Sequence, residues 1–386
     1  MTESPHVIFR TDASAAIGSG HFMRCLTLAR MLANRGAGIT FLCKHLPDFF
    51  EEQLAQNGFL LHRLRTRDEP DRCGGLAHSH WLGTSQETDA RACLDILARS
   101  DPAFSTCAGK PPLCIVDHYA LDACWESMMR ASVSTIMVID DLADRFHDCD
   151  ILLDQNLIPN RQQSYLSKTP ESCTLLLGPK YALLRDEFSK LRQSIMPRDG
   201  QVSRVLLFLG GVDRNNHTGL ALRALQYLHK KLTIDVVIGA GNPNRHDVEA
   251  LCKKLQARCH VQSTRMAELM ARADFAIGAA GSASWERCCL GLPSILFILA
   301  DNQRPIGMAL HNLGACVALA TNTHINEHLI AKTLGELFDN PGRLRDMSRK
   351  AHDLVDGRGC YRVGKIIFDT WKGEKDGTQK SLVSRP

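Results

Sequence analysis

The segment Gly18-Ser-Gly-His-Phe-Met-Arg24 follows a short β-branched and aromatic run and contains residue types suited to acid–base chemistry. Glycines let backbone N–H groups approach a ligand closely, and a helix N-terminus attracts anions. His21 and Arg24 are three positions apart, so on a helix they share one face. The helix dipole and the arginine both disfavour the charged imidazolium, which would keep His21 neutral, as a general base must be. A role for His21 as a cap or a packed side chain is the alternative.

A second segment, Gly278–Glu286, also lies between a predicted strand and a predicted helix. Its small residues and the hydroxyls of Ser282 and Ser284, at a helix N-terminus, can hold a diphosphate. Glu286, one turn into the helix, is placed to accept hydrogen bonds from ribose hydroxyls. The alternative for Glu286 is an ordinary carboxylate favoured by the helix dipole.

Two other predicted strand ends carry candidate nucleotide contacts. The apolar run Arg204–Leu209 ends in Gly210-Gly211, and the strand at 293–298 is followed by Ala300-Asp-Asn-Gln303. The amide of Asn302 suits recognition of a base or a sugar. Capping of the next helix by Asp301 is the alternative reading of that segment.

Metal and disulfide signals are weak in this sequence. Asp140-Asp-Leu-Ala-Asp144 suggests a cation, because hard cations prefer carboxylates, but adjacent residues of an extended chain point opposite ways. Fifteen cysteines include no C-x-x-C pair, and most lie in apolar runs, which indicates reduced, buried thiols. We therefore expect no metal and no other cofactor. Asp117-His-Tyr119, at the end of a predicted strand, is a candidate sugar contact.

These segments require elements that bring strand ends together. In each half an apolar strand ends in a glycine-containing turn that leads into a helix, and short apolar runs then alternate with helical patterns. This alternation is typical of a doubly wound α/β domain. We predict further strands near 38–44, 59–64, 113–117, 134–140, 150–154, 233–238, 259–263, 273–278, 293–298 and 315–319. Helices are predicted near 20–35, 86–100, 216–230, 244–258, 282–290, 302–313, 326–338 and 341–354.

The predicted boundary between two domains lies near 186–203, where a charged run meets a turn-rich break. The domains are therefore expected at 1–195 and 196–386, and two doubly wound domains facing each other would leave a cleft between them. Polar stretches at 66–84 and 104–112 read as surface loops. The polar tail after Lys372 is expected to fray.

The composition excludes several classes of protein. The 386 residues are 44% hydrophobic and 23% charged, which excludes a disordered or collagen-like chain. A net charge of +4 is too small for a dedicated nucleic-acid binder but suits an anionic small molecule. The longest apolar stretch, around Leu292–Ala300, is too short for a membrane span, and no signal peptide is recognisable. We expect a cytoplasmic protein without a membrane or nucleic-acid partner.

Ordered motifs from Val7 to Lys372 resemble the UDP-sugar hydrolases of the pseudaminic acid pathway, a family related to glycosyltransferases with two Rossmann-like domains facing a cleft (the GT-B type). The resemblance is carried by Arg10–Asp12, Ile17–Leu26, Trp81–Gln86, Asp117–Tyr119, Asp140–Asp144, Asp154–Asn156, Leu177–Arg185, Gly210–Asp213, Gly281–Glu286 and Asp301–Gln303. The stretches 66–80 and 104–112 do not match. The family's role is in pseudaminic acid biosynthesis, which serves flagellin glycosylation and cell-surface polysaccharide.

The resemblance implies hydrolysis of UDP-2,4-diacetamido-2,4,6-trideoxy-β-L-altropyranose to UDP and the free sugar, with His21 as the base. Water activated by His21 would attack the anomeric carbon, with C–O cleavage and inversion. The N-terminal domain would hold sugar and phosphate through Asp12, Gly18, Gly20, Arg24, Asp117, Tyr119 and Arg185. The C-terminal domain would hold UDP through Gly210, Gly211, Asp213, Ser282, Ser284, Glu286 and Asn302. A glycosyltransferase that uses an acceptor, or a UDP-sugar binding protein without catalysis, is the alternative; a monomer is expected.

Overall fold

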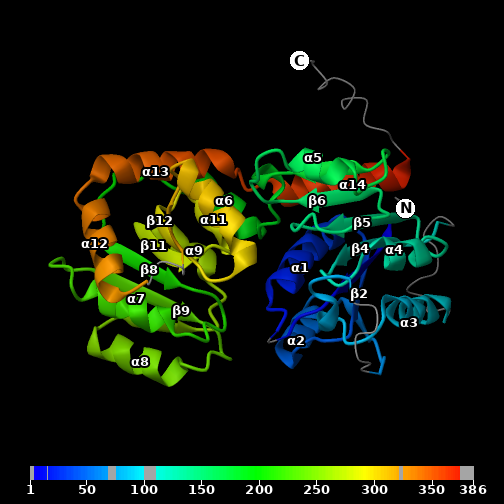
Figure 1. Cartoon of the computed structure of the whole chain (residues 1–386), viewed down its shortest axis with the longest axis horizontal. Coiled ribbons are helices and arrows are strands. Elements are labelled where there is room, and N and C mark those ends of the chain that lie inside the picture. Colours follow the sequence, from blue (N-terminus) through cyan, green and yellow to red (C-terminus); the bar gives the residue numbers. More distant parts are fainter. Residues whose placement is uncertain (1–3, 15, 68–74, 100–109, 321–324, 374–386) are drawn as a thin grey trace, which may run out of the picture. The chain divides into compact units, whose positions relative to one another are not determined.

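The computed structural model describes residues 4–14, 16–67, 75–99, 110–320 and 325–373 (Figure 1). The chain forms two compact α/β units. Unit 1 comprises the described residues of 1–155, 160–177 and 359–386, and unit 2 comprises those of 156–159 and 178–358. Each unit has its own parallel sheet covered by helices, which confirms the predicted class of two doubly wound domains.

Unit 1 is built on a seven-stranded parallel sheet in the order β3-β2-β1-β4-β5-β6-β7. Its strands are β1 (His6–Thr11), β2 (Gly38–Cys43), β3 (Leu60–Arg63), β4 (Leu113–Asp117), β5 (Thr135–Ile139), β6 (Ile151–Asp154) and β7 (Thr174–Leu177). Its helices are α1 (Gly20–Ala33), α2 (Asp48–Gln56), α3 (Gln86–Ala98), α4 (Ala123–Met129), α5 (Arg161–Leu166) and α14 (Gly359–Lys372), with a 3₁₀ turn at Ser79–Trp81. Every residue of β4, β5 and β6 is buried, as expected for strands covered on both faces.

Unit 2 is built on a six-stranded parallel sheet in the order β10-β9-β8-β11-β12-β13. Its strands are β8 (Arg204–Phe208), β9 (Thr233–Ile238), β10 (Arg258–Val261), β11 (Phe275–Ala279), β12 (Ser294–Ile298) and β13 (Val317–Ala320). Its helices are α6 (Asp186–Ser194), α7 (His217–Leu225), α8 (Arg245–Lys254), α9 (Met266–Arg272), α10 (Ala283–Cys289), α11 (Arg304–Asn312), α12 (Glu327–Phe338) and α13 (Pro341–Leu354). Short 3₁₀ turns lie at Pro179–Tyr181 and Asp301–Gln303.

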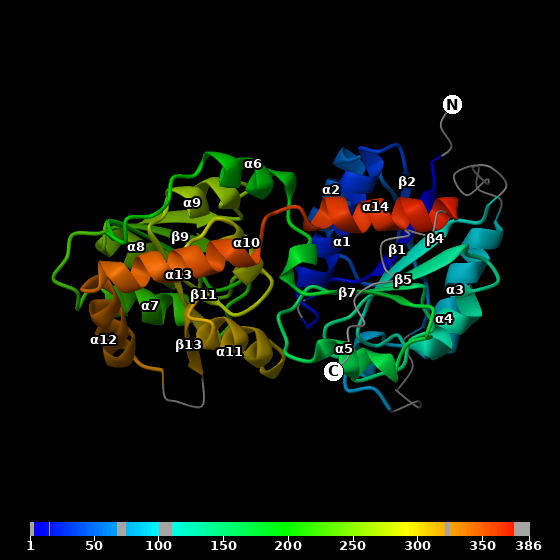
Figure 2. The same cartoon turned by 90° about the horizontal axis from the view of Figure 1, so that it is seen from above.

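The compact units differ from the expected halves at three places. Residues 156–159 belong to unit 2, residues 178–195, including α6, also belong to unit 2, and α14 returns to unit 1 from the far end of the chain. Helix α14 packs on α1 (Figure 2), where Gly364 makes room for Met31: a Cβ on the glycine would lie 2.0 Å from Met31 Cε. The buried Val363, Ile367 and Trp371 recur at helical spacing, but this pattern alone does not reveal which unit they cover.

Several elements were not predicted. Strand β7 has four residues at the sheet edge, and helices α2, α4, α5, α6, α9 and α14 were all missed. Most of these helices have nine residues or fewer, which leaves little room for a periodic pattern. The expected loop at 66–84 includes a 3₁₀ turn and the buried Leu82. Residues 68–74 and 104–109 of the expected loops, and the tail from 374 onward, lie outside the described residues.

In both sheets the winding reverses between two neighbouring central strands. The pair is β1 and β4 in unit 1, where Thr11 lies opposite Asp117, and β8 and β11 in unit 2, where Phe208 lies opposite Gly278. Loops leaving such a pair diverge toward opposite faces of the sheet, and ligands of doubly wound domains bind at the carboxyl ends of these strands. The segments at 12–24, 117–119, 210–213 and 280–286 follow these four strands, whereas those at 140–144 and 301–303 follow β5 and β12.

Candidate functional site

His21 and Asp117 form a buried pair at the point where the winding of unit 1 reverses. His21 lies in the first turn of α1, and Asp117 is the last residue of β4. The distance between Nδ1 of His21 and Oδ1 of Asp117 is 2.6 Å, and Asp117 is fully buried. Because an ionised carboxylate only accepts, this bond keeps the imidazole hydrogen on Nδ1. Among the described residues, no hydrogen bond occupies Nε2 of His21, so its lone pair is available to a substrate or water.

Arg24 holds this carboxylate and a second one. Its Nε donates to Oδ2 of Asp117 (2.6 Å), its Nη2 donates to Oδ1 (2.7 Å), and its Nη1 donates to Asp141 Oδ2 (3.1 Å). Burial alone would raise the pKa of Asp117, but the charges and hydrogen bonds of Arg24 and His21 hold it well below its usual range. Arg24 and Asp117, expected as substrate contacts, therefore direct their polar atoms mainly at each other.

The charges around His21 differ from those inferred from the sequence. That inference placed only the helix dipole and Arg24 beside the imidazole. The fold adds Asp117 in direct contact and Asp141 on the other side of Arg24, so two carboxylates face one guanidinium. Both carboxylates are placed to stabilise positive charge that develops beside them when a base takes up a proton.

An aromatic cluster lies against the imidazole. The Tyr119 ring meets the His21 ring edge-on at 4.4 Å between centroids, and the Trp81 ring stacks on Tyr119 at 5.5 Å. The hydroxyl of Tyr119 donates to Asp141 in a short hydrogen bond. Trp81 and Asp141 were not proposed as site residues, although both belong to motifs that carry the family resemblance. Tyr119 was proposed, and the structure brings it to His21.

Asp12, Gly18 and Gly20 follow β1 but have different surroundings. Asp12 is fully buried, and its Oδ1 accepts hydrogen bonds from the backbone N–H groups of Lys44 (2.7 Å) and His45 (3.1 Å). It thus anchors the segment after β2 rather than facing a ligand. Gly18 has φ +81°, and no atom lies within 4 Å of the position of a Cβ at either glycine. The glycine turn therefore faces open space, as a ligand-binding turn must.

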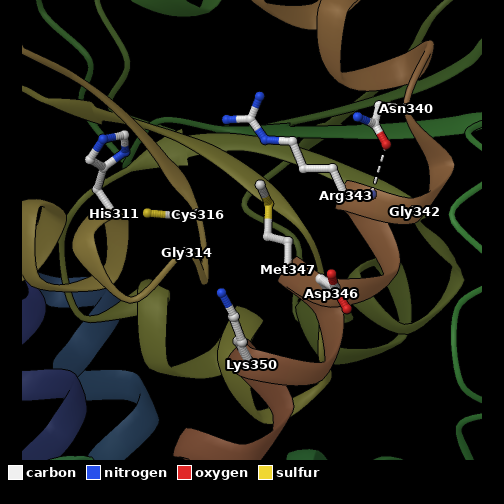
Figure 3. A pocket seen from close by; sticks show the side chains of 9 residues that line it. All are labelled: His311, Gly314, Cys316, Asn340, Gly342, Arg343, Asp346, Met347 and Lys350. Carbon is white, nitrogen blue, oxygen red and sulfur yellow. Dashed lines mark hydrogen bonds between the residues drawn. The ribbon is translucent and has the colours of Figure 1, made fainter.

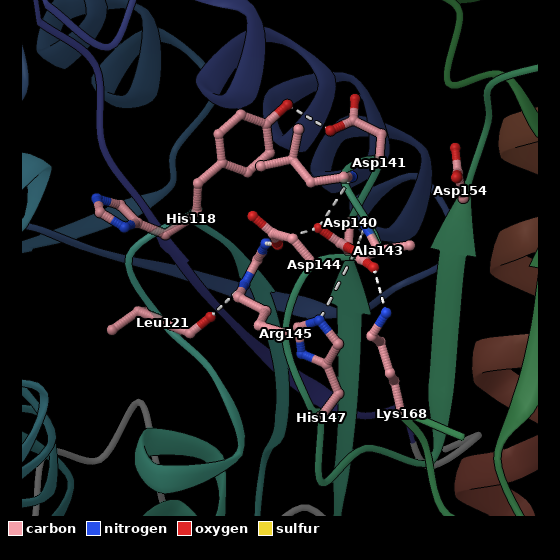
Figure 4. A network of polar contacts seen from close by, with 12 residues as sticks. His118, Leu121, Asp140, Asp141, Ala143, Asp144, Arg145, His147, Asp154 and Lys168 are labelled. Atoms are coloured by element: carbon pink, nitrogen blue, oxygen red, sulfur yellow. Dashed lines mark hydrogen bonds and ion pairs between the residues drawn. The ribbon is translucent and has the colours of Figure 1, made fainter. Parts of the chain in front are cut away.

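The adjacent carboxylates of the acidic motif Asp140–Asp144 point to different partners, as the sequence predicts (Figure 4). Asp140 is buried beside Arg145 (2.9 Å) and accepts from the hydroxyl of Tyr165 (3.0 Å), whereas Asp141 points to Tyr119 and Arg24. The prediction that adjacent carboxylates diverge is confirmed. Within the described ranges, no group of three or more His, Cys, Asp or Glu side chains is arranged to hold a metal ion.

In unit 2, the turn after β8 combines open glycines with a helix cap. Gly210 (φ +101°) and Gly211 have no atom within 4 Å of the position of a Cβ. The carboxylate of Asp213 accepts from the backbone N–H groups of His217 (3.0 Å) and Thr218 (2.8 Å) at the start of α7. Asp213, expected to bind UDP, therefore shapes the glycine turn through these bonds.

The residues expected in the turn after β11 separate into exposed and buried ones. Ser282 precedes α10 and is exposed, whereas the hydroxyl of Ser284 is buried and accepts from Arg287 Nη2 (3.0 Å). Glu286 is half-buried, and burial raises its pKa against the opposing charge of Arg185. Arg185 lies in unit 2, 3.6 Å from Glu286, and not in the first domain where it was expected.

The turn after β12 contributes two amides. Asn302 lies exposed in the 3₁₀ turn, whereas Gln303 accepts from the backbone N–H of Leu299 (3.1 Å). The Nε2 atom of Gln303 is 4.0 Å from the position of a Cβ at Gly281. Gln303 therefore lies beside the turn after β11, although the sequence argument favoured its neighbour Asn302.

A surface pocket of about 440 Å³ lies elsewhere in unit 2, beside the amino end of β13 (Figure 3). Its lining residues come from α11, α13 and the segments next to them: His311, Gly314, Cys316, Asn340, Gly342, Arg343, Asp346, Met347 and Lys350. None of the residues singled out from the sequence lines it.

Comparison with known proteins supports the fold and the class of domain in unit 2. Residues 205–357 match the Glycosyltransferase family 28 C-terminal domain. The chain is 25% identical over 200 residues to the spore coat polysaccharide biosynthesis protein SpsG of Bacillus subtilis, a match that covers 51% of this chain and 59% of that protein. It is 23% identical over 265 residues to the UDP-2,4-diacetamido-2,4,6-trideoxy-beta-L-altropyranose hydrolase of Campylobacter jejuni, covering 68% of this chain and 81% of that protein.

Solved structures share the whole architecture. MurG of Acinetobacter baumannii superposes with a TM-score of 0.61 at 15% identity, over 94% of this chain and 99% of that one. UGT2 of Phytolacca americana superposes with a TM-score of 0.67 at 13% identity, over 96% of this chain and all of that one. No helix among the described residues has the length and apolar character needed to cross a bilayer. The chain has the GT-B fold, and its residues 205–357 are similar to the C-terminal domain of glycosyltransferase family 28.

Proposed function

We propose that this chain hydrolyses UDP-2,4-diacetamido-2,4,6-trideoxy-β-L-altropyranose to UDP and the free sugar. The observation that carries the proposal is the His21–Asp117 pair, with Nε2 of His21 unoccupied among the described residues and open glycines preceding it. The similarity to the Campylobacter hydrolase supports the choice of substrate. The similarity of residues 205–357 to a glycosyltransferase domain supports nucleotide-sugar chemistry.

In the proposed reaction, Nε2 of His21 removes a proton from water as the water oxygen attacks the anomeric carbon. The bond between that carbon and the diphosphate oxygen breaks, and its electron pair leaves with UDP. The configuration at carbon is thereby inverted. Asp117 accepts from Nδ1 throughout and stabilises the imidazolium as it forms, a form of electrostatic assistance that needs no rearrangement.

Unit 2 would bind UDP at the carboxyl ends of β8 and β11. The open turns at Gly210-Gly211 and at Gly281-Ser282 offer backbone N–H groups and a hydroxyl to the diphosphate. Glu286 would accept from the ribose hydroxyls, and Asn302 would contact the base or the sugar. We propose that no cation is required, because Asp140 and Asp141 are already engaged by arginine and tyrosine side chains.

A glycosyltransferase that passes the sugar to an acceptor is the second candidate. It is favoured by the match to the glycosyltransferase domain and by the fold shared with MurG and UGT2. The two functions differ in what attacks the anomeric carbon, since a hydrolase needs only water.

The test is UDP release from a panel of UDP-diacetamido sugars in ¹⁸O-water, without any acceptor. The hydrolase is supported if UDP is released and the label enters the free sugar. Label in the UDP phosphate would mean attack at phosphorus and would rule out the proposed role of His21. Release that depends on an added acceptor would identify a glycosyltransferase, and binding without release would identify a binding protein.

A further inference from the structure

Arg287 bridges the two ends of the turn that follows β11. Its side chain is 2% exposed, and its Nη2 donates to the carbonyl oxygen of Ala279 (2.7 Å) and to the hydroxyl of Ser284 (3.0 Å). Ala279 is the last residue of β11, and Ser284 lies in the first turn of α10. The guanidinium therefore lies beside the turn that carries Gly281 and Ser282, and it links the backbone carbonyl at the end of β11 to a side-chain hydroxyl at the start of α10.

Gly278 creates the space for this guanidinium. A Cβ at Gly278 would lie 2.5 Å from Arg287 Nη1 and 3.1 Å from the carbonyl oxygen of Phe208 in β8. A Cβ there would displace the guanidinium and press on the carbonyl of Phe208, so the glycine is favoured by a close approach rather than by its backbone angle. Because Phe208 and Gly278 are paired across β8 and β11, the charge is located where the winding of unit 2 reverses.

The charge of Arg287 has no partner of opposite sign in direct contact. Both hydrogen-bond acceptors are neutral, its Nε is buried without a partner, and no ion pair is formed with any residue of the described chain. Burial lowers the pKa of Arg287, but a guanidinium remains protonated at neutral pH. The nearby carboxylate of Glu286 offsets part of the cost of burying this cation, and an anion bound at the adjacent turn would offset more of it.

We infer that Arg287 is a positioning residue for the diphosphate of a bound nucleotide, and that its positive charge makes unit 2 prefer nucleoside diphosphates to neutral nucleosides. The inference rests on the proposed binding of UDP in unit 2. The guanidinium acts through the turn: it holds the backbone so that the N–H groups face the ligand, and it adds positive charge beside them. No step of the reaction passes through Arg287.

Calorimetry with UDP and with uridine on the full-length chain tests the inference. Arg287→Met removes the charge and keeps much of the volume, so UDP binding should weaken by roughly tenfold or more, while uridine binding changes less than about twofold. Arg287→Lys keeps the charge and should retain most of the preference for UDP. If Arg287 had only a structural role, Arg287→Met would weaken the binding of UDP and of uridine equally, and Arg287→Lys would not restore UDP binding.

Arg198 offers a matched control. It is partly buried and, like Arg287, donates to backbone carbonyls, with Nε donating to Gly291 (3.0 Å) and Nη2 to Met270 (3.2 Å). It lies at the opposite ends of the strands, because it also contacts the carbonyl of Ala273, before β11. Burial lowers its pKa to about 10. Arg198→Met should lower the melting temperature and leave the ratio of UDP to uridine affinity unchanged.

The outcomes separate the inference from the proposed function. A wild-type chain that does not bind UDP would overturn both. A wild-type chain that binds UDP, with an Arg287→Met variant that keeps the wild-type ratio of UDP to uridine affinity, would overturn the inference alone. If Arg287→Met does not fold, the ratio of UDP to uridine affinity is measured on Arg287→Gln instead. An Arg287→Lys variant that binds UDP as weakly as the neutral variant would also overturn the inference.

Discussion

Asp117 and His21 are 96 positions apart in the sequence, yet Oδ1 of the one lies 2.6 Å from Nδ1 of the other. The contact exists because β1 and β4 are neighbours in the sheet, and α1 is the first helix after the carboxyl end of β1. Arg24, one turn further along α1, closes the arrangement with two hydrogen bonds to the same carboxylate. The pair makes His21 an oriented base with a defined free nitrogen.

Replacing either member of the pair should abolish most turnover. We expect His21→Ala and Asp117→Asn to lower kcat by about 10²–10⁴-fold, the first by removing the base and the second by removing the charge that orients and stabilises it. UDP affinity, measured by calorimetry, should change by less than about twofold, since the nucleotide is assigned to unit 2. His260→Ala is the control, because that histidine pairs with Asp235 at 2.9 Å within unit 2. Near-wild-type kcat in His21→Ala would reject the base.

Tyr119 should act through its hydrogen bond to Asp141 as well as through its ring. Tyr119→Phe keeps the ring against His21 but removes the hydroxyl that donates to Asp141, and about 1 kcal/mol for that bond corresponds to a roughly fivefold lower kcat. Tyr119→Ala also removes the stacking partner of Trp81 and should cost more. Steady-state kcat and KM of both variants test this order. Equal losses in the two variants would show that the ring contributes nothing.

Chelation should leave the activity intact. We propose that backbone N–H groups and a hydroxyl bind the diphosphate. The carboxylates of Asp140 and Asp141 already form ion pairs with arginine side chains. UDP release after EDTA treatment should match the untreated rate. A loss that Mg²⁺ or Mn²⁺ restores would contradict the proposal and return the acidic motif to the catalytic candidates.

Folding stability should fall at alkaline pH because of His147 (Figure 4). Burial lowers the pKa of His147, but hydrogen bonds and charges from Asp140 and Glu126 outweigh it and raise the pKa to about 9. A raised pKa contributes stability that is complete below the unfolded value near 6.5 and is lost as the pH rises through about 9. The loss is at most about 3.4 kcal/mol. The free energy of unfolding, measured in urea, should decrease between pH 6 and pH 9.5 in the wild type. The decrease should be smaller in His147→Asn.

Unit 2 should bind UDP on its own. The residues assigned to the nucleotide lie within Gly178–Arg358, and α14 completes unit 1 instead. A fragment of these residues should fold and bind UDP by calorimetry. A fragment of 201–386 lacks α6 and carries α14 without the surface of α1, so we expect it to be less stable. A folded Gly178–Arg358 fragment without affinity for UDP, alongside a full chain that binds it, would contradict the assignment.

The sequence by itself determined the local features of this protein. Short apolar runs that alternate with helical patterns predicted twelve of the strands that the structure describes, and the residue types around His21 indicate a candidate site without any tertiary contact. The divergence of Asp140 and Asp141 also followed from local geometry, because successive side chains of an extended chain point to opposite sides. Such features depend on neighbours a few residues away, which a single sequence contains.

Only the tertiary structure decided which distant residues meet. Asp117 was expected to touch the sugar and instead orients His21, Arg185 was expected in the first domain and instead lies beside Glu286, and α14 crosses back to unit 1. Each of these contacts depends on the order of the strands in the sheet and on the surface against which the apolar face of a helix packs. Hydrophobic periodicity specifies that a face must be buried but not against what, so these pairings appear only once the whole chain is folded.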